Sequence, residues 1–236
     1  MTKPLIGVLS RVAPPQLTLD AVRRAGGHPW PVSMQGTPQD TEVSEVLARV
    51  GALVLSDGPE LRPLELKTGG NGAPTVIEAE VSLVRAALDV DMPVYGIGRG
   101  FQVLNIAQGG SIAKMAAGHA ADAEHLEDSE GQSMFHHVYI SPGSKLAAVV
   151  GSGGFVRVNS RHRFGVREAQ KAELLRASAY CMDDGVIEAL ESPRHRWVIG
   201  VQFRPELRLE IPPHFDRLMQ SLVERANERL HATNSP

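Results

Sequence analysis

The first hundred residues of this 236-residue chain alternate between short apolar runs and segments with apolar residues at helical spacing. Each run is bounded by turn residues, which favours a buried strand. This alternation predicts the α/β class, with a mostly parallel central sheet flanked by helices. Pro29 and Pro31 place the second strand near a sheet edge. The expected strands are 5–10, 28–32, 52–56 and 94–97, and the expected helices are 17–25, one opened by Thr37-Pro38, 76–90 and 100–108.

The second half of the chain is richer in strand-like runs and predicts an added antiparallel region. Asp184-Gly185 separates two of these runs and is a strong hairpin signal. Polar residues dominate 116–130, which we interpret as an excursion or lid. The expected strands are 135–140, 155–158, 174–181, 186–191 and 197–203, followed by a helix over about 213–230. Because no Pro/Ser-rich linker divides the chain, we expect one domain over residues 1–236.

Composition excludes several classes of function. The net charge of −3 argues against a general nucleic-acid binder. The single cysteine, Cys181, excludes an internal disulfide and fits a reducing compartment. The apolar run at 5–9 is too short for a signal peptide, and no apolar stretch has the length of a membrane span. We therefore expect a cytoplasmic protein.

The segment 93–110 predicts a strand, a sharp turn and a helix in immediate succession. Such an elbow lifts a catalytic side chain above the end of a sheet. The residue at the turn is Gly98, which has no side chain to act as a nucleophile. Glycine also tolerates a positive φ without the strain that a residue with a Cβ would carry.

The elbow resembles that of class I glutamine amidotransferase-like proteins, in particular the gamma-glutamyl-gamma-aminobutyrate hydrolase branch. That branch has G-I-C-R-G-x-Q-x-x-N, with cysteine where this chain has Gly98. The resemblance covers nearly the whole chain and implies a flavodoxin-like fold. Its further blocks are L-x-G-G-x-D-x-x-P at 55–63, V-N-S-x-H-H-Q at 158–164, D-G-x-I-E-A-x-E at 184–191 and G-V-Q-W-H-P-E at 200–206.

The resemblance implies a Cys–His–Glu triad, and two of its three positions differ here. Gly98 stands at the cysteine position and Arg204 at the histidine position, while Glu206 is retained. A guanidinium stays protonated at neutral pH and cannot act as the base. The resemblance also places Asp57 beside the retained Gly58, at a turn whose backbone N–H faces an oxyanion. We expect no intact catalytic set at these positions.

Other residues are weaker candidates for the missing chemistry. Cys181 ends an expected strand, where a lone cysteine is usually a small core residue. Ser160 is close to His162 in sequence, but no elbow accompanies it. The histidines around the excursion have no compact ligand spacing, and we expect neither a metal site nor a cofactor. These histidines are His119, His125, His136 and His137.

Several arginines belong to segments that the implied fold brings to the carboxyl ends of the strands, where ligands bind in open α/β sheets. A cluster there would favour a carboxylate or phosphate, assisted by the N–H donors at the start of the elbow helix. The alternative is that these arginines face solvent or pair with Glu60, Glu168 or Glu206. The candidate ligand-binding residues are Gly58, Arg99, Gly100, Gln102, Arg161, Arg163 and Arg204.

Three functions fit these observations. The first is a non-catalytic relative of the hydrolases that binds a small anionic ligand or a partner protein, either a second copy or a synthase-type subunit. The second is an active gamma-glutamyl amide hydrolase or glutamine amidotransferase with non-standard catalytic residues. The third is a structural module that forms dimers. Membrane and nucleic-acid partners are not expected.

Overall fold

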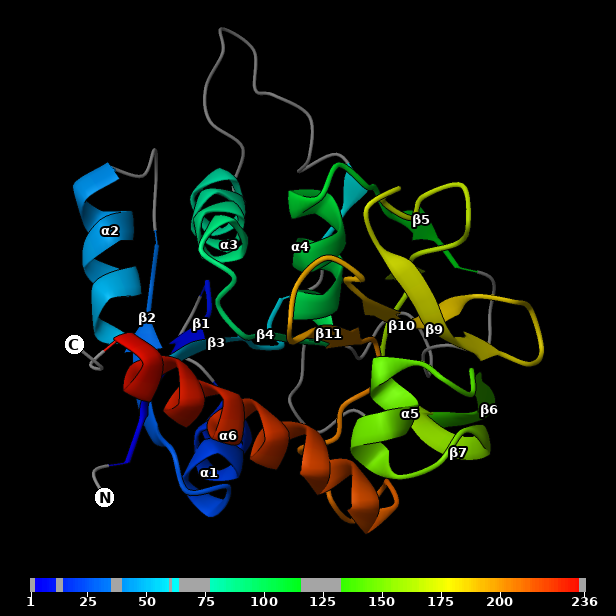
Figure 1. Ribbon diagram of the computed structural model, residues 1–236. Coiled ribbons are helices and arrows are strands. Elements are labelled where there is room, and N and C mark those ends of the chain that lie inside the picture. Colours follow the sequence, from blue (N-terminus) through cyan, green and yellow to red (C-terminus); the bar gives the residue numbers. More distant parts are fainter. Residues whose placement is uncertain are drawn as a thin grey trace, which may run out of the picture.

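A computed structural model describes residues 3–11, 15–34, 40–59, 61–63, 77–115 and 133–233. Its main feature is a nine-stranded sheet in the order β2-β1-β3-β4-β11-β10-β9-β6-β7 (Figure 1). The Gly-rich stretch 69–72 and the excursion at 116–130 lie outside the described residues.

The first part of the sheet is parallel. Neighbouring pairs from β2 to β11 run in the same direction, as expected from the strand–helix alternation. Its strands are β1 (Leu5–Leu9), β2 (His28–Val32), β3 (Ala52–Leu55), β4 (Val94–Ile97) and β11 (Val198–Val201). The proline-containing β2 lies at the edge, which confirms its predicted place. Prolines are tolerated there because they interrupt no ladder on the outer side.

The remaining strands extend the sheet with antiparallel pairs. They are β6 (Met134–Ile140), β7 (Gly154–Ser160), β9 (Arg176–Cys181) and β10 (Ile187–Glu191). The predicted hairpin joins β9 to β10, and Gly185 adopts a φ of 71° in its turn. A second, two-stranded sheet pairs β5 (Ala113–Lys114) with β8 (Phe164–Gly165). The fold is therefore the expected α/β sheet with an added antiparallel region.

Helices cover both faces of the sheet (Figure 1). On one face lie α2 (Asp40–Arg49), α3 (Glu78–Asp89) and α4 (Arg99–Ala107). On the other face lie α1 (Gln16–Arg24), α5 (Lys145–Val150) and α6 (Asp216–Thr233), which follows a short 3-10 turn at Pro213–Phe215. Each face has its own apolar core. Val46, Leu83 and Leu104 belong to one core, and Val22, Leu146 and Leu222 belong to the other.

One helix, α5, has no counterpart among the expected elements and is only six residues long. Ser144 caps this helix by accepting a hydrogen bond from the Ala147 N–H at 3.0 Å. Gly151 ends it in the left-handed conformation, with a φ of 96°. These are ordinary start and stop signals, but a single turn and a half contains too few apolar positions to show a helical period.

The topology brings three loops from separate parts of the chain to the same edge of the sheet. Gly98 directly follows β4, and Arg204 comes three residues after β11, which pairs with β4 in parallel. Asp57 comes two residues after β3, on the other side of β4. All three therefore lie at the carboxyl ends of adjacent parallel strands, the edge where open α/β sheets bind ligands. None of the helices in the described ranges has the length and apolarity that a bilayer crossing requires.

Candidate functional site at the glycine elbow

The turn between β4 and α4 is a tight elbow centred on Gly98. Gly98 has φ 54° and ψ −111°, a conformation that side chains disfavour. Its N–H donates to the Val201 carbonyl at 2.9 Å, which ties the elbow to β11. Gly100 allows α4 to approach β3 closely, since a Cβ at Gly100 would lie 2.5 Å from the carbonyl carbon of Leu55. The elbow geometry predicted from sequence is therefore present.

The Asp57 carboxylate occupies the space beside Gly98 where a side chain would lie. A Cβ built on Gly98 would overlap this carboxylate and sit 2.9 Å from its carbon, Cγ. The Asp57 Oδ1 atom accepts a hydrogen bond from the Arg99 N–H at 3.0 Å, at the start of α4. The positive end of the helix dipole adds to the stabilisation of the carboxylate there. The elbow thus holds an internal carboxylate in place of a side chain of its own.

Arg204 joins Asp57 to Glu206. Its Nη1 lies 2.9 Å from the Asp57 Oδ2, and its Nε donates to the Glu206 Oε1 at 2.9 Å. The main chain of Arg204 is fixed by Asn159, whose Oδ1 accepts from the Arg204 N–H at 2.8 Å. We call these three side chains, Asp57, Arg204 and Glu206, the elbow ion cluster.

The electrostatics of the elbow ion cluster keep Arg204 charged. Burial disfavours the charged guanidinium, but the carboxylates of Asp57 and Glu206 outweigh it and raise the pKa of Arg204 above its ordinary value. Burial also raises the pKa of Glu206, and the nearby Arg204 opposes that rise. A guanidinium whose pKa is raised further has no capacity to accept a proton from a nucleophile at neutral pH.

Two of the other predicted arginines, Arg99 and Arg161, are engaged by carboxylates of the chain. The buried Arg99 makes two hydrogen bonds to Glu80 of α3, at 2.9 and 2.5 Å. Arg161 donates from Nη2 to Glu210 at 3.0 Å, and Glu210 also accepts from Asn159 at 2.9 Å. Arg161 and Arg204 are therefore linked through Asn159, whereas the Arg99 side chain is directed to α3.

The remaining predicted site residues surround the elbow. Gly58 packs beside Arg99, with a built Cβ 3.6 Å from its Cδ atom. The Gln102 amide donates to the Phe164 carbonyl at 2.7 Å and to the Gln202 side chain at 3.1 Å. Arg163 lies between β7 and β8, where its carbonyl accepts from the Met115 N–H. Gln102 thus ties α4 to the antiparallel region.

The structure adds several polar partners that sequence reasoning did not assign. Glu80, Asn159 and Glu210 hold Arg99, Arg204 and Arg161 in place. The one sequence signal for these partnerships is Asp57, which stands where the corresponding block of the hydrolases has glycine. The partnerships themselves join positions far apart in the chain, so no local pattern indicates them.

A second buried charge cluster lies in the antiparallel region. Glu188 of β10 is fully buried, and its Oε1 is 3.4 Å from the Nε2 atoms of both His136 and His162. Burial opposes ionisation of Glu188, but hydrogen bonds from the two histidines outweigh it and hold the pKa of Glu188 well below its ordinary value. Burial also opposes the charge on His136, yet Glu188 raises its pKa overall. No local sequence pattern indicates this cluster, because its three residues come from separate strands and loops.

The alternative nucleophile and metal candidates find no support in the described part of the chain. Cys181 is buried in the core, and burial raises its pKa to about 11, which leaves the thiol protonated at neutral pH. His136 is buried and His137 is exposed, as expected for neighbours on a strand. The described residues contain no group of three or more side chains suited to a metal ion. His119 and His125 lie outside the described residues.

The glycine at the elbow yields a direct test of the packing. We expect Gly98→Ala to lower the free energy of unfolding by about 2–3 kcal/mol, because the new Cβ is strained and meets Asp57. Adding Asp57→Gly should recover part of that loss, measured by urea denaturation. Gly109→Ala is the matched control, since Gly109 also has a positive φ but open space around it. If Asp57→Gly recovered as much stability in the Gly109→Ala variant as in the Gly98→Ala variant, the contact between the new side chain at position 98 and Asp57 would be contradicted.

Comparison with known proteins agrees with the fold. The model of the Peptidase C26 family matches residues 10–206. The chain belongs to the Peptidase C26 family. Sequence relatives of this Peptidase C26 chain are glutamine amidotransferase-like and gamma-glutamyl hydrolase-like proteins.

Two relatives and one solved structure illustrate the range of similarity. A Mycobacterium tuberculosis protein described as a "putative glutamine amidotransferase" is 34% identical over 217 residues, which cover 88% of this chain and 66% of the relative. The gamma-glutamyl-gamma-aminobutyrate hydrolase of Escherichia coli O157:H7 is 27% identical over 198 residues, which cover 80% and 76%. The glutaminase domain of Trypanosoma brucei CTPS with bound acivicin has a TM-score of 0.66 at 18% identity and covers 96% and 94%, so it shows the shared fold.

Proposed function

We propose that this Peptidase C26 chain is catalytically degenerate and binds a small carboxylate-type anion at the elbow without hydrolysing it. One observation carries the proposal: the Asp57 carboxylate fills the side-chain space at Gly98 and is held there by Arg204. A hydrolase of this kind requires a nucleophile at the elbow and a base beside it. The elbow ion cluster supplies neither.

The three changed positions depend on one another. Gly98 leaves room for Asp57, Asp57 supplies a negative charge for Arg204, and Arg204 compensates Glu206. A partly buried Arg204 without these carboxylates would be destabilising, since an unpaired charge that is largely shielded from water costs folding free energy. The set therefore supports a stable replacement of the triad by an ion cluster.

The elbow ion cluster suits an external carboxylate. The side chains of Arg204 and Asp57 are 18% and 19% exposed, so the ion pair borders solvent. Among the described residues, Arg204 uses Nε for Glu206 and Nη1 for Asp57, so the Nη2 donors are available to a ligand. Asp57 is then an internal competitor, because it already occupies part of the guanidinium that a ligand carboxylate would bind.

The names of relatives suggest which anions to try. The Escherichia coli relative is named for gamma-glutamyl-gamma-aminobutyrate, and the Trypanosoma brucei structure is a glutaminase domain of CTPS. We therefore include a gamma-glutamyl group as the candidate ligand. A synthase-type subunit is the candidate protein partner by the same analogy.

Isothermal calorimetry with glutamate, glutamine and gamma-glutamyl-gamma-aminobutyrate tests this function. We expect binding without release of ammonia or amine. Arg204→Gln should weaken binding at least about tenfold, through loss of the charged Nη2 donors. Asp57→Asn should strengthen it by about tenfold, because the internal competitor loses its charge. Arg167→Gln is the control, an arginine paired with Asp184 away from the elbow.

Two results would contradict the proposal in different ways. Metal-independent turnover of a gamma-glutamyl amide by pure protein, abolished by Asp57→Asn or Glu206→Gln, would favour an active hydrolase with non-standard residues. If neither the unaltered chain nor Asp57→Asn bound any of the three compounds, the proposal of a carboxylate-type ligand would be wrong.

A further inference from the structure

A broad cavity lies at the edge of the sheet opposite the elbow. Pro93 precedes β4 and Trp197 precedes β11, and both line this cavity, whereas Gly98 and Arg204 follow the same two strands. A four-residue strand spans about 13 Å, so the cavity is separate from the elbow ion cluster. Its volume is about 750 Å³, and its long walls come from α5 and α6. We call it the α5–α6 groove.

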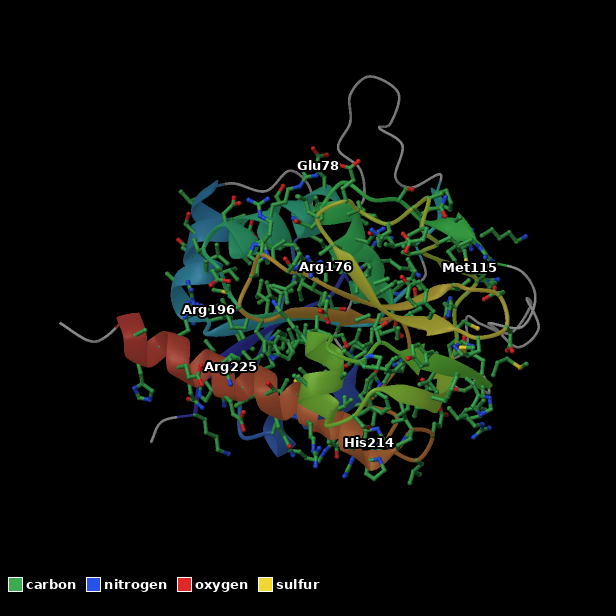
Figure 2. The ribbon with its side chains drawn as sticks, turned by 45° about the vertical axis from the view of Figure 1, so that its right-hand side comes forward. Glu78, Met115, Arg176, Arg196, His214 and Arg225 are labelled. Atoms are coloured by element: carbon green, nitrogen blue, oxygen red, sulfur yellow. The ribbon has the colours of Figure 1, made fainter. Side chains whose placement is uncertain are left out.

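The α5–α6 groove has an excess of basic side chains, which come from three segments of the chain. They are Lys145, Arg196, Arg217, Arg225 and Arg229. In Figure 2, Arg196 and Arg225 lie on the same side of the molecule, near α6. The excess is local, since the whole chain has a net charge of −3. A local concentration of one charge attracts the opposite charge and steers its approach.

Three of these cations are held by main-chain carbonyls. The Lys145 Nζ donates to the carbonyls of Ser192, at 2.6 Å, and His195. The Arg217 Nη1 donates to the Val150 carbonyl at 3.0 Å. The Arg229 Nη1 donates to the Val90 carbonyl at 2.8 Å. A carbonyl fixes the side chain without cancelling its charge. Because an ammonium has three N–H donors and a guanidinium has five, donors remain for a ligand in both.

The acidic residues of the groove are fewer and mostly paired. Asp91 binds Arg196 at 2.7 Å, and Glu228 binds Arg225 at 2.7 Å. Glu224 is the third acidic residue of the lining. These pairs are exposed on the surface and contribute little to stability. The lining therefore has more basic than acidic side chains, however these side chains pair with one another.

We propose that the α5–α6 groove binds an acidic segment of a partner protein. The charges are spread along the groove, since Arg217 and Arg229 lie about 18 Å apart along α6. A small anion needs donors that converge on one point, whereas spaced cations match spaced carboxylates. An extended or helical acidic segment has that spacing. This site is independent of the elbow and of the ligand proposed there.

Fluorescence anisotropy with a labelled oligo-glutamate peptide tests the groove, with an oligo-glutamine peptide as the neutral control. We expect saturable binding of the acidic peptide that weakens as salt rises, because exposed charges are screened. Arg217→Gln combined with Arg225→Gln should weaken binding about tenfold. The matched control removes the same charge elsewhere, through Arg24→Gln and Lys114→Gln, and should change affinity less than about twofold. Arg196→Gln, from a separate segment, should also weaken binding.

Three results would overturn the proposal. The first is no saturable binding of the acidic peptide at low salt. The second is an equal loss of affinity in the groove pair and the control pair, which would indicate a non-specific charge effect. The third is displacement of the peptide by inorganic phosphate or ATP at equal or lower concentration, which would assign the groove to small anions.

Discussion

The triple variant Asp57→Gly, Gly98→Cys, Arg204→His is expected to hydrolyse a gamma-glutamyl amide at least about 10³-fold faster than the unaltered chain. The three substitutions supply a thiol at the elbow and a base beside it. The retained Glu206 can then orient the base. The substitutions also remove the carboxylate that fills the space beside Gly98. The measurement is release of ammonia or amine from glutamine and gamma-glutamyl-gamma-aminobutyrate.

The double variant Gly98→Cys, Arg204→His is the decisive comparison. It retains Asp57, whose carboxylate overlaps the position of a new side chain and would repel a thiolate. We expect its rate to stay within about tenfold of the unaltered chain. The effects of residues that act as one catalytic set are not additive, so restoring two of them gives little activity while Asp57 still blocks the elbow. A double variant as active as the triple variant would show that Asp57 does not block the elbow. An inactive but folded triple variant would show that the substrate pocket has been lost as well.

Glu188→Gln is expected to lower the free energy of unfolding by about 3 kcal/mol near pH 6. The change removes the negative charge of a fully buried carboxylate whose Oε1 lies 3.4 Å from both His136 and His162, and it leaves two buried imidazoles beside a neutral amide. Urea denaturation of the full chain measures the effect. Glu168→Gln is the control, because the exposed Glu168 accepts a hydrogen bond from the half-buried Tyr180.

The pH dependence gives this prediction a definite sign. The pKa of Glu188 is lowered on folding, so its contribution is present above the ordinary carboxyl pKa and is lost only as pH falls through the lower folded value. The pKa of His136 is raised, so its contribution is present below the ordinary imidazole pKa and is lost as pH rises through the higher folded value. The difference between the unaltered chain and Glu188→Gln should therefore be largest between about pH 4.5 and 6.5 and smaller at pH 8. A difference that grows steadily to pH 8 would contradict the charged pair.

Local patterns predicted most of the fold. The apolar runs 5–10, 52–56 and 94–97 contain β1, β3 and β4, because strands buried on both faces are continuous in apolar residues. The Asp184-Gly185 turn identified the β9–β10 hairpin, since its glycine is needed at a positive φ. The short α5 escaped prediction because its period is too brief to detect.

By itself the sequence determined the parallel and hairpin elements, the Peptidase C26-like elbow and the presence of Gly98 and Arg204 in it. Only the tertiary structure decided that Asp57 fills the space at Gly98, that Arg99 is paired to Glu80 and that Glu188 is buried between two histidines. Strand and turn signals are local, because they depend on backbone conformation and on the period of burial. The partner of a charged side chain, in contrast, depends on which distant segment of the chain the order of the strands places beside it.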